Sequence, residues 1–180
     1  PGEQGGNGVA DVLFGDYNPS AKLPVTFYKD DSQLPDFDDY DMSNRTYRYY
    51  TGKPLYPFGY GLTYGDTQVR SVSSDGRQAR VKAVNRGAAT EDVVQLYIHD
   101  ALSPDAAPNP KLCGFRRIFL AAGEEKEIVI PLDEAALRVC NEDGVWTSGS
   151  GKWDLYASFG QPDKRTEELT GKKAAHCVIG

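Results

Sequence analysis

The sequence has few of the residues that mark disulfide-bonded or metal-binding proteins. Its 180 residues include 3 cysteines and 2 histidines. Cys113, Cys140 and Cys177 form no CxxC pair, and we interpret them as small buried apolar residues, with one disulfide and one free thiol as the alternative. His99 and His176 are isolated, so we expect no metal site and no cofactor.

Long apolar runs and clusters of basic residues are also missing. Apolar stretches such as 118–122 are far shorter than the about 20 residues that cross a bilayer. The first residues also lack the basic segment followed by an apolar one that marks a signal peptide. There are 20 Lys and Arg against 26 Asp and Glu, a net charge of −6. We therefore expect neither a membrane nor a nucleic-acid partner. P-loop and Gly-x-Ser-x-Gly motifs do not occur.

The first residues predict one helix and one strand. Val9, Val12 and Leu13 share a helical face that ends at Gly15, and Leu23–Phe27 are typical of an edge strand. Such a pair cannot bury its apolar faces alone. Either it packs on the rest of the chain or it ends a larger α/β domain, and we favour the second interpretation.

Residues 29–65 show neither the helical nor the strand period of apolar residues. An acidic stretch, densest at 36–41, is followed by an aromatic one. The acidic stretch lacks the spacing of a calcium loop, and we interpret it as solvated. A long aromatic loop in a compact protein is typical of a segment that lies on another surface.

From about residue 66 apolar and polar residues alternate. Asp75-Gly76 separates two such segments and predicts a two-residue hairpin. About seven short strands predict a mainly β fold, an antiparallel β-sandwich of the immunoglobulin or fibronectin III type. Trp153 falls on the buried face of its strand, whereas Tyr97 and Tyr156 face outward. For Trp146 the sequence leaves open whether the ring is buried in the core or is available to a carbohydrate.

Specific motifs carry a family resemblance. PGEQGGNGVADVLFGDYNPSAKLP at the start resembles the closing helix and strand of the second domain of glycoside hydrolase family 3. The segment that follows it in that family is similar to RTYRYY (45–50) and PLYPFGYGLTY (54–64). The family's fibronectin III-like domain is similar to VVQLY (93–97), KLCGF (111–115) and GKWDLY (151–156). The resemblance ends near residue 160.

This resemblance implies the C-terminal structural portion of a retaining β-glycosidase that removes terminal β-linked glucose or xylose from oligosaccharides. It divides the chain into the end of an α/β sandwich domain (1–28), a linker wrapping the catalytic domains (29–65), a fibronectin III-like β-sandwich (66–160) and a C-terminal tail (161–180). In the family the nucleophilic Asp and the acid/base Glu precede the segment that begins here. We therefore expect no catalytic residue in this chain, and no activity from it alone.

The same mapping suggests weak substrate contacts. Glu3 and Gln4 lie in the turn before the first helix, where ligands of open α/β sheets bind, or they only begin the helix. Arg45 and Tyr47 lie in the aromatic stretch and either contact a sugar or fill an interdomain seam. The expected partners are the missing catalytic domains and, through them, an oligosaccharide. A homo-oligomer is possible, and the sequence does not decide the oligomeric state.

A stand-alone carbohydrate-binding β-sandwich is the alternative. It requires an exposed strip of aromatic side chains on one sheet face, which Tyr97 and Tyr156 would begin. The free cysteines favour the cytoplasm over the periplasm or secretion, and the compartment stays open.

Overall fold

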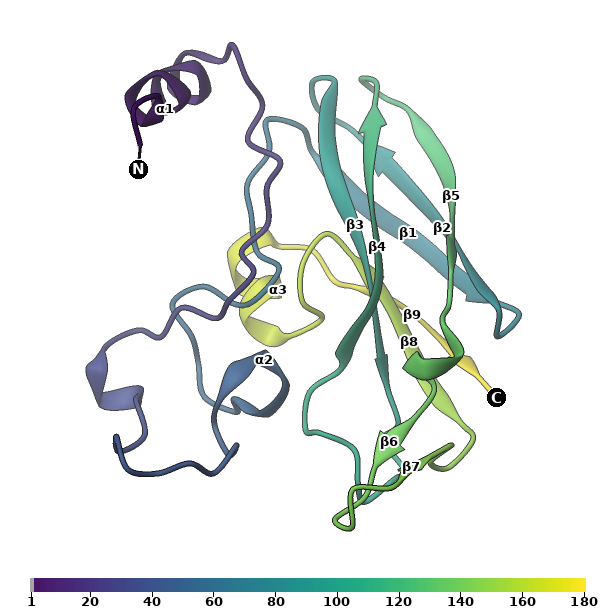
Figure 1. Cartoon of the computed structure of the whole chain (residues 1–180). Helices are drawn as coiled ribbons and strands as arrows, with labels where there is room; N and C mark the ends of the chain where they lie inside the picture. Colours follow the sequence, from purple (N-terminus) through teal and green to yellow (C-terminus); the bar gives the residue numbers. More distant parts are fainter. Residues whose placement is uncertain (1) are drawn as a thin grey trace.

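The computed structural model describes residues 2–180, and two antiparallel sheets packed face to face dominate it (Figure 1). One sheet has the order β1-β2-β5, with β1 at Thr67–Ser74, β2 at Gln78–Asn85 and β5 at Glu125–Pro131. The other has the order β4-β3-β8-β9, with β3 at Thr90–His99, β4 at Lys111–Leu120, β8 at Trp153–Ser158 and β9 at Ala175–Ile179. A two-stranded ribbon joins β6 (Val139–Cys140) to β7 (Trp146–Thr147).

Three helices and two short 3-10 turns complete the described residues. The helices are α1 (Gly5–Phe14), α2 (Thr46–Tyr49) and α3 (Lys164–Thr170), and the turns are η1 (Asp31–Gln33) and η2 (Glu134–Ala136). As predicted, α1 ends at Gly15, which adopts the left-handed conformation that glycine tolerates best. None of the helices among residues 2–180 is long and apolar enough to cross a bilayer.

The core lies between the two sheets, where alternate residues of each strand point inward. Val81, Leu96 and Leu155 are fully buried there, and Trp153 is 4% exposed, which confirms its predicted place in the core. Burial of a large aliphatic side chain contributes about 1.5–3 kcal/mol, so this alternation holds the two sheets together. The predicted mainly β, fibronectin III-like sandwich is therefore confirmed.

Two local predictions were wrong. Asp75-Gly76 turns the chain between β1 and β2, but Arg77 also belongs to the connection, so the hairpin loop is longer than two residues. Leu23–Phe27 form no strand: the segment runs beside residues 55–60 and makes a single bridge, from Phe27 to Tyr56. Because only a few backbone hydrogen bonds join these two segments, no ladder develops.

The cysteines and the C-terminal segment also differ from the simplest expectation. All three cysteines are free, and Cys140 is exposed on the β6–β7 ribbon, whereas Cys113 and Cys177 pack against the core. Residues 161–180, predicted as a tail, contribute α3 and β9, and β9 pairs with β8 along its length. This segment therefore belongs to the sandwich.

Candidate functional site

Parts of residues 18–64 pack against the β4-β3-β8-β9 sheet, at its outer face near Gln95 and at its edge near Asp92, and we call this contact the linker interface. Its strongest polar contact is an ion pair between Lys22 Nζ and Asp92 Oδ1 at 2.7 Å, with side chains 10% and 2% exposed. Thr67 Oγ1 donates to the other carboxylate oxygen of Asp92 at 2.6 Å. A buried charge needs such partners, so the pair ties the linker to β3.

The middle of the linker interface is aromatic. Tyr97, expected to face outward on β3, does so but is fully buried, because the rings of Tyr47 and Phe58 cover it at centroid distances of 6.4 and 6.5 Å. Its hydroxyl donates to Gln95 Oε1 at 2.6 Å, and Gln95 Nε2 donates to Gly59 O at 3.0 Å. Burial raises the pKa of the Tyr97 hydroxyl, so this network stays neutral.

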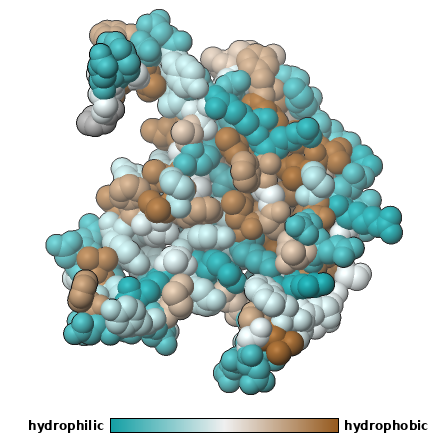
Figure 2. All heavy atoms as spheres, in the orientation of Figure 1, coloured by the Kyte–Doolittle hydropathy of each residue, from teal (hydrophilic) through white to brown (hydrophobic). Residues whose placement is uncertain are grey.

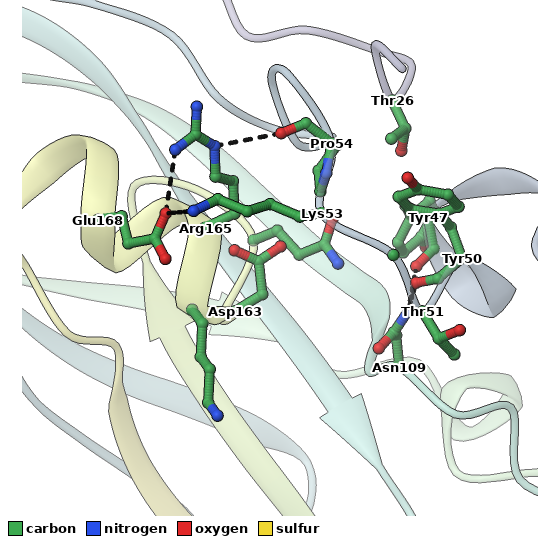
Figure 3. A pocket seen from close by; sticks show the side chains of 13 residues that line it. Thr26, Tyr47, Tyr50, Thr51, Lys53, Pro54, Asn109, Asp163, Arg165 and Glu168 are labelled. Atoms are coloured by element: carbon green, nitrogen blue, oxygen red, sulfur yellow. Dashed lines mark hydrogen bonds and ion pairs between the residues drawn. The ribbon is translucent and has the colours of Figure 1, made fainter. Parts of the chain in front are cut away.

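A cavity of about 380 Å³ opens beside this interface, between α2 and α3 (Figure 3). On one side Glu168 accepts from Lys53 Nζ at 2.7 Å and from Arg165 Nη1 at 3.0 Å, and these contacts lower the pKa of its carboxyl. On the other side Tyr47 and Tyr50 line the cavity. Burial raises the pKa of both tyrosines.

The carboxylates of this cavity already have structural partners. Asp163 caps α3 by accepting from Thr166 N at 2.6 Å, and burial raises its pKa in spite of that bond. Glu168 is held by two cations. A catalytic pair needs one carboxyl free to donate a proton and one free to attack, and these two groups are committed to the helix cap and to ion pairs.

The residues predicted to contact substrate do not come together around one cavity. Glu3 and Gln4 are exposed before α1, where Gln4 Oε1 accepts from Asn7 Nδ2 at 2.6 Å. The Arg45 guanidinium donates to backbone carbonyls of the acidic stretch, one of them Asp41 O at 2.8 Å. Of the four, Tyr47 alone lines a described cavity.

Tyr47 also has the contacts expected of an interdomain seam. Its ring stacks on Phe58 at 4.1 Å, and its hydroxyl accepts from Leu112 N at 3.0 Å. Sequence reasoning missed Asn109, whose side chain donates to Tyr47 O and Tyr50 O at 2.9 and 2.8 Å and so fixes α2 on the β3–β4 connection. Its neighbouring prolines signal a loop but not these distant partners.

The N-terminal helix stands apart from the rest of the described chain (Figures 1 and 2). None of its residues is buried, and Val9, Leu13 and Phe14 are 60%, 75% and 84% exposed. The contacts between this helix and the rest of the described chain include a hydrogen bond from the Tyr64 hydroxyl to Val12 O. An amphipathic helix is normally stabilised by packing of its apolar side, which these residues do not provide.

Comparisons with known proteins assign this architecture. Residues 1–64 match the glycosyl hydrolase family 3 C-terminal domain, and residues 92–159 match a fibronectin type III-like domain. The chain belongs to glycosyl hydrolase family 3, as a C-terminal portion. The linker side of the interface lies in the first matched range, and Asp92, Gln95 and Tyr97 lie in the second, so the linker interface joins the two family domains.

Curated relatives and solved structures agree. The chain is 40% identical to a xylan 1,4-beta-xylosidase of Xylanibacter ruminicola, over 94% of this chain and 20% of that protein. It is 36% identical to a periplasmic beta-glucosidase of Salmonella typhimurium, over 86% of this chain and 23% of that protein. A beta-glucosidase structure from Erythrobacter marinus matches with a TM-score of 0.76 and 30% identity, over 99% of this chain and 24% of that one. The chain thus spans about a fifth to a quarter of the length of these relatives.

Proposed function

We propose that this chain is the C-terminal structural portion of a retaining β-glycosidase that removes terminal β-linked glucose or xylose from oligosaccharides. Relatives named as a beta-xylosidase and a beta-glucosidase support the activity of the longer protein. As the family resemblance implies, we assign the reactive carboxylates to a portion of such a longer protein that precedes the aligned region. The proposed partners are those catalytic domains and, through them, the oligosaccharide.

The observation that carries this proposal is the contrast between the two ends of residues 2–64. From Asn18 onward the segment is fastened to the sandwich, and the buried Lys22–Asp92 pair lies near its start. Before it, α1 exposes its apolar side chains. A segment held firmly at one end and unpartnered at the other suits a connection that fixes the sandwich against the catalytic domains.

Substrate contact by Glu3, Gln4, Arg45 and Tyr47 stays a prediction. Glu3 and Gln4 are exposed in the turn before α1, so they are accessible to a neighbouring domain and to its substrate. Tyr47 has most of its contacts within the linker interface, which favours a positioning role.

Hydrolysis of p-nitrophenyl β-D-xyloside and β-D-glucoside tests the proposal. The 180-residue chain should show no turnover above buffer, and the longer protein that contains it should turn over one or both substrates. Turnover by the chain, lost when one of its own carboxylates is changed to the amide, would refute the assignment.

The alternative, a stand-alone carbohydrate-binding module, loses one of its two sheet-face tyrosines. Tyr97 lies beneath the linker and is inaccessible to a glycan, whereas Tyr156 keeps part of its surface. Titration with neutral xylo- and cello-oligosaccharides decides: a saturable response at Tyr156 would favour the module.

A further inference from the structure

A second cavity, of about 250 Å³, lies at the end of the sandwich that carries the β6–β7 ribbon (Figure 1). Tyr49 of α2, the ends of β3 and β4, and the ribbon enclose it. The residues that matter for its chemistry are three cations and three aromatic residues: Arg48, Lys111, Arg138, Tyr49, Trp146 and Trp153.

The three cations have no acidic partner within 4.0 Å among residues 2–180. Arg48 Nε is buried and donates to no partner among residues 2–180, although its guanidinium lies 5.5 Å from the ring centre of Tyr49. Lys111 Nζ donates to Arg138 O at 2.8 Å and lies 5.7 Å from the ring centre of Trp153. Burial, and then the charge of Arg48, lower the pKa of Lys111. Arg48 and Lys111 therefore repel each other at this cavity.

Two acidic residues, Asp100 and Asp105, also line the cavity and offset part of this charge, so three cations face two carboxylates. Asp100 accepts from Ser150 N and Oγ, both at 2.6 Å, and from Leu102 N and Ser103 N at 3.2 and 3.0 Å. Its oxygens are thus occupied by neutral donors of the adjoining loops. Asp105 is exposed and forms no ion pair with the three cations. A carboxylate that entered the cavity would meet three cations that form no ion pair with either of these carboxylates.

The aromatic side chains narrow the class of ligand further. Trp146 is 59% exposed, and aromatic faces pack well against the C–H faces of sugar rings. Guanidinium and ammonium groups form strong charge-assisted hydrogen bonds to carboxylates. We propose that this cavity binds a sugar that carries a carboxylate, a uronic acid unit of an oligosaccharide. The choice of a sugar rests on the proposed glycosidase function; the choice of an anion rests on the cavity alone.

Tryptophan fluorescence tests this proposal, because both tryptophans of the chain line the cavity. The 180-residue chain is titrated with sodium D-glucuronate, with D-glucose and with sodium acetate at constant ionic strength. We expect a saturable change with glucuronate, and binding at least about tenfold weaker for glucose, which lacks the charge, and for acetate, which lacks the ring. Added salt should weaken the glucuronate response.

Matched variants locate the site. Arg138→Gln, at an exposed position, should weaken glucuronate binding about tenfold, as should Arg48→Gln, while Arg70→Gln, exposed on β1, should leave it unchanged. Absence of a saturable response, an unchanged affinity in both Arg48 and Arg138 variants, or equal binding of acetate would overturn the proposal. The assay involves no hydrolysis, so its failure is distinct from failure of the glycosidase assignment.

Discussion

Neutralising Lys22 is the sharpest perturbation of the linker interface. Lys22→Met keeps the aliphatic stem and removes the charge that lies 2.7 Å from Asp92 Oδ1. The carboxylate, 2% exposed, would then be buried without a counter-charge. Removing one partner of such a pair costs about 3–5 kcal/mol. At about 2–4 °C per kcal/mol for a protein of this size, the midpoint of thermal unfolding should fall by at least about 6 °C.

A matched control separates burial from charge. Arg80 Nη1 lies 3.5 Å from Glu127 Oε1, and both side chains are about half exposed, so Arg80→Gln removes an ion pair of the surface kind. Its expected cost is at most about 1 kcal/mol. Calorimetric scans of the two variants and the parent chain make the comparison. Equal melting of the Lys22 and Arg80 variants would refute the claim that a buried pair fastens the linker.

Three further predictions concern the turns, the pH dependence and the thiols. Gly59→Ala should destabilise the chain to urea by more than Gly76→Ala does, because both glycines have a φ near +80° but only at Gly59 would a Cβ clash with other side chains, those of Gln95 and Tyr97. Equal midpoints would contradict this. Burial works to raise the pKa of Asp100, but hydrogen bonds from Ser150 and the turn outweigh it and hold the pKa below 3.8. Their stabilisation is complete above the unfolded pKa and is lost as pH falls through the folded one, so the melting difference between Ser150→Ala and the parent should be present at pH 6 and shrink below about pH 4. A difference that persists in acid would refute that assignment. Cys140 should react with an aromatic disulfide at pH 8 well before the other two thiols, whose pKa values burial raises; a fast phase that survives Cys140→Ser would show otherwise.

The strands between residues 66 and 160 were predictable because their alternation reflects one physical cause, burial of one face. The inward positions of β2, β3, β5 and β8 fall where the sequence placed them. Alternation cannot say what covers the outer face, and Tyr97 is buried for that reason by rings from residues 47 and 58. Strand β9 (Ala175–Ile179) was not predicted from the sequence, because this strand is short and follows a polar helix.

Candidate sites were harder to predict because they depend on contacts between distant residues. The pair of Lys22 and Asp92 joins residues 70 positions apart, and no local pattern connects the two. The cavity lined by Arg48, Lys111 and Arg138 likewise gathers three separate segments. Local patterns report which residues are buried, whereas tertiary folding decides which charges meet.

Hydrogen exchange at α1 tests the central claim, that the first residues complete a domain supplied by the rest of a longer glycosidase. A ten-residue helix with no buried side chain should be marginal, so amides of Gly5–Phe14 should exchange rapidly in the 180-residue chain while those of β3 stay protected. In the longer protein the same helix should be protected by orders of magnitude. Equal, rapid exchange of α1 in both proteins would contradict the account.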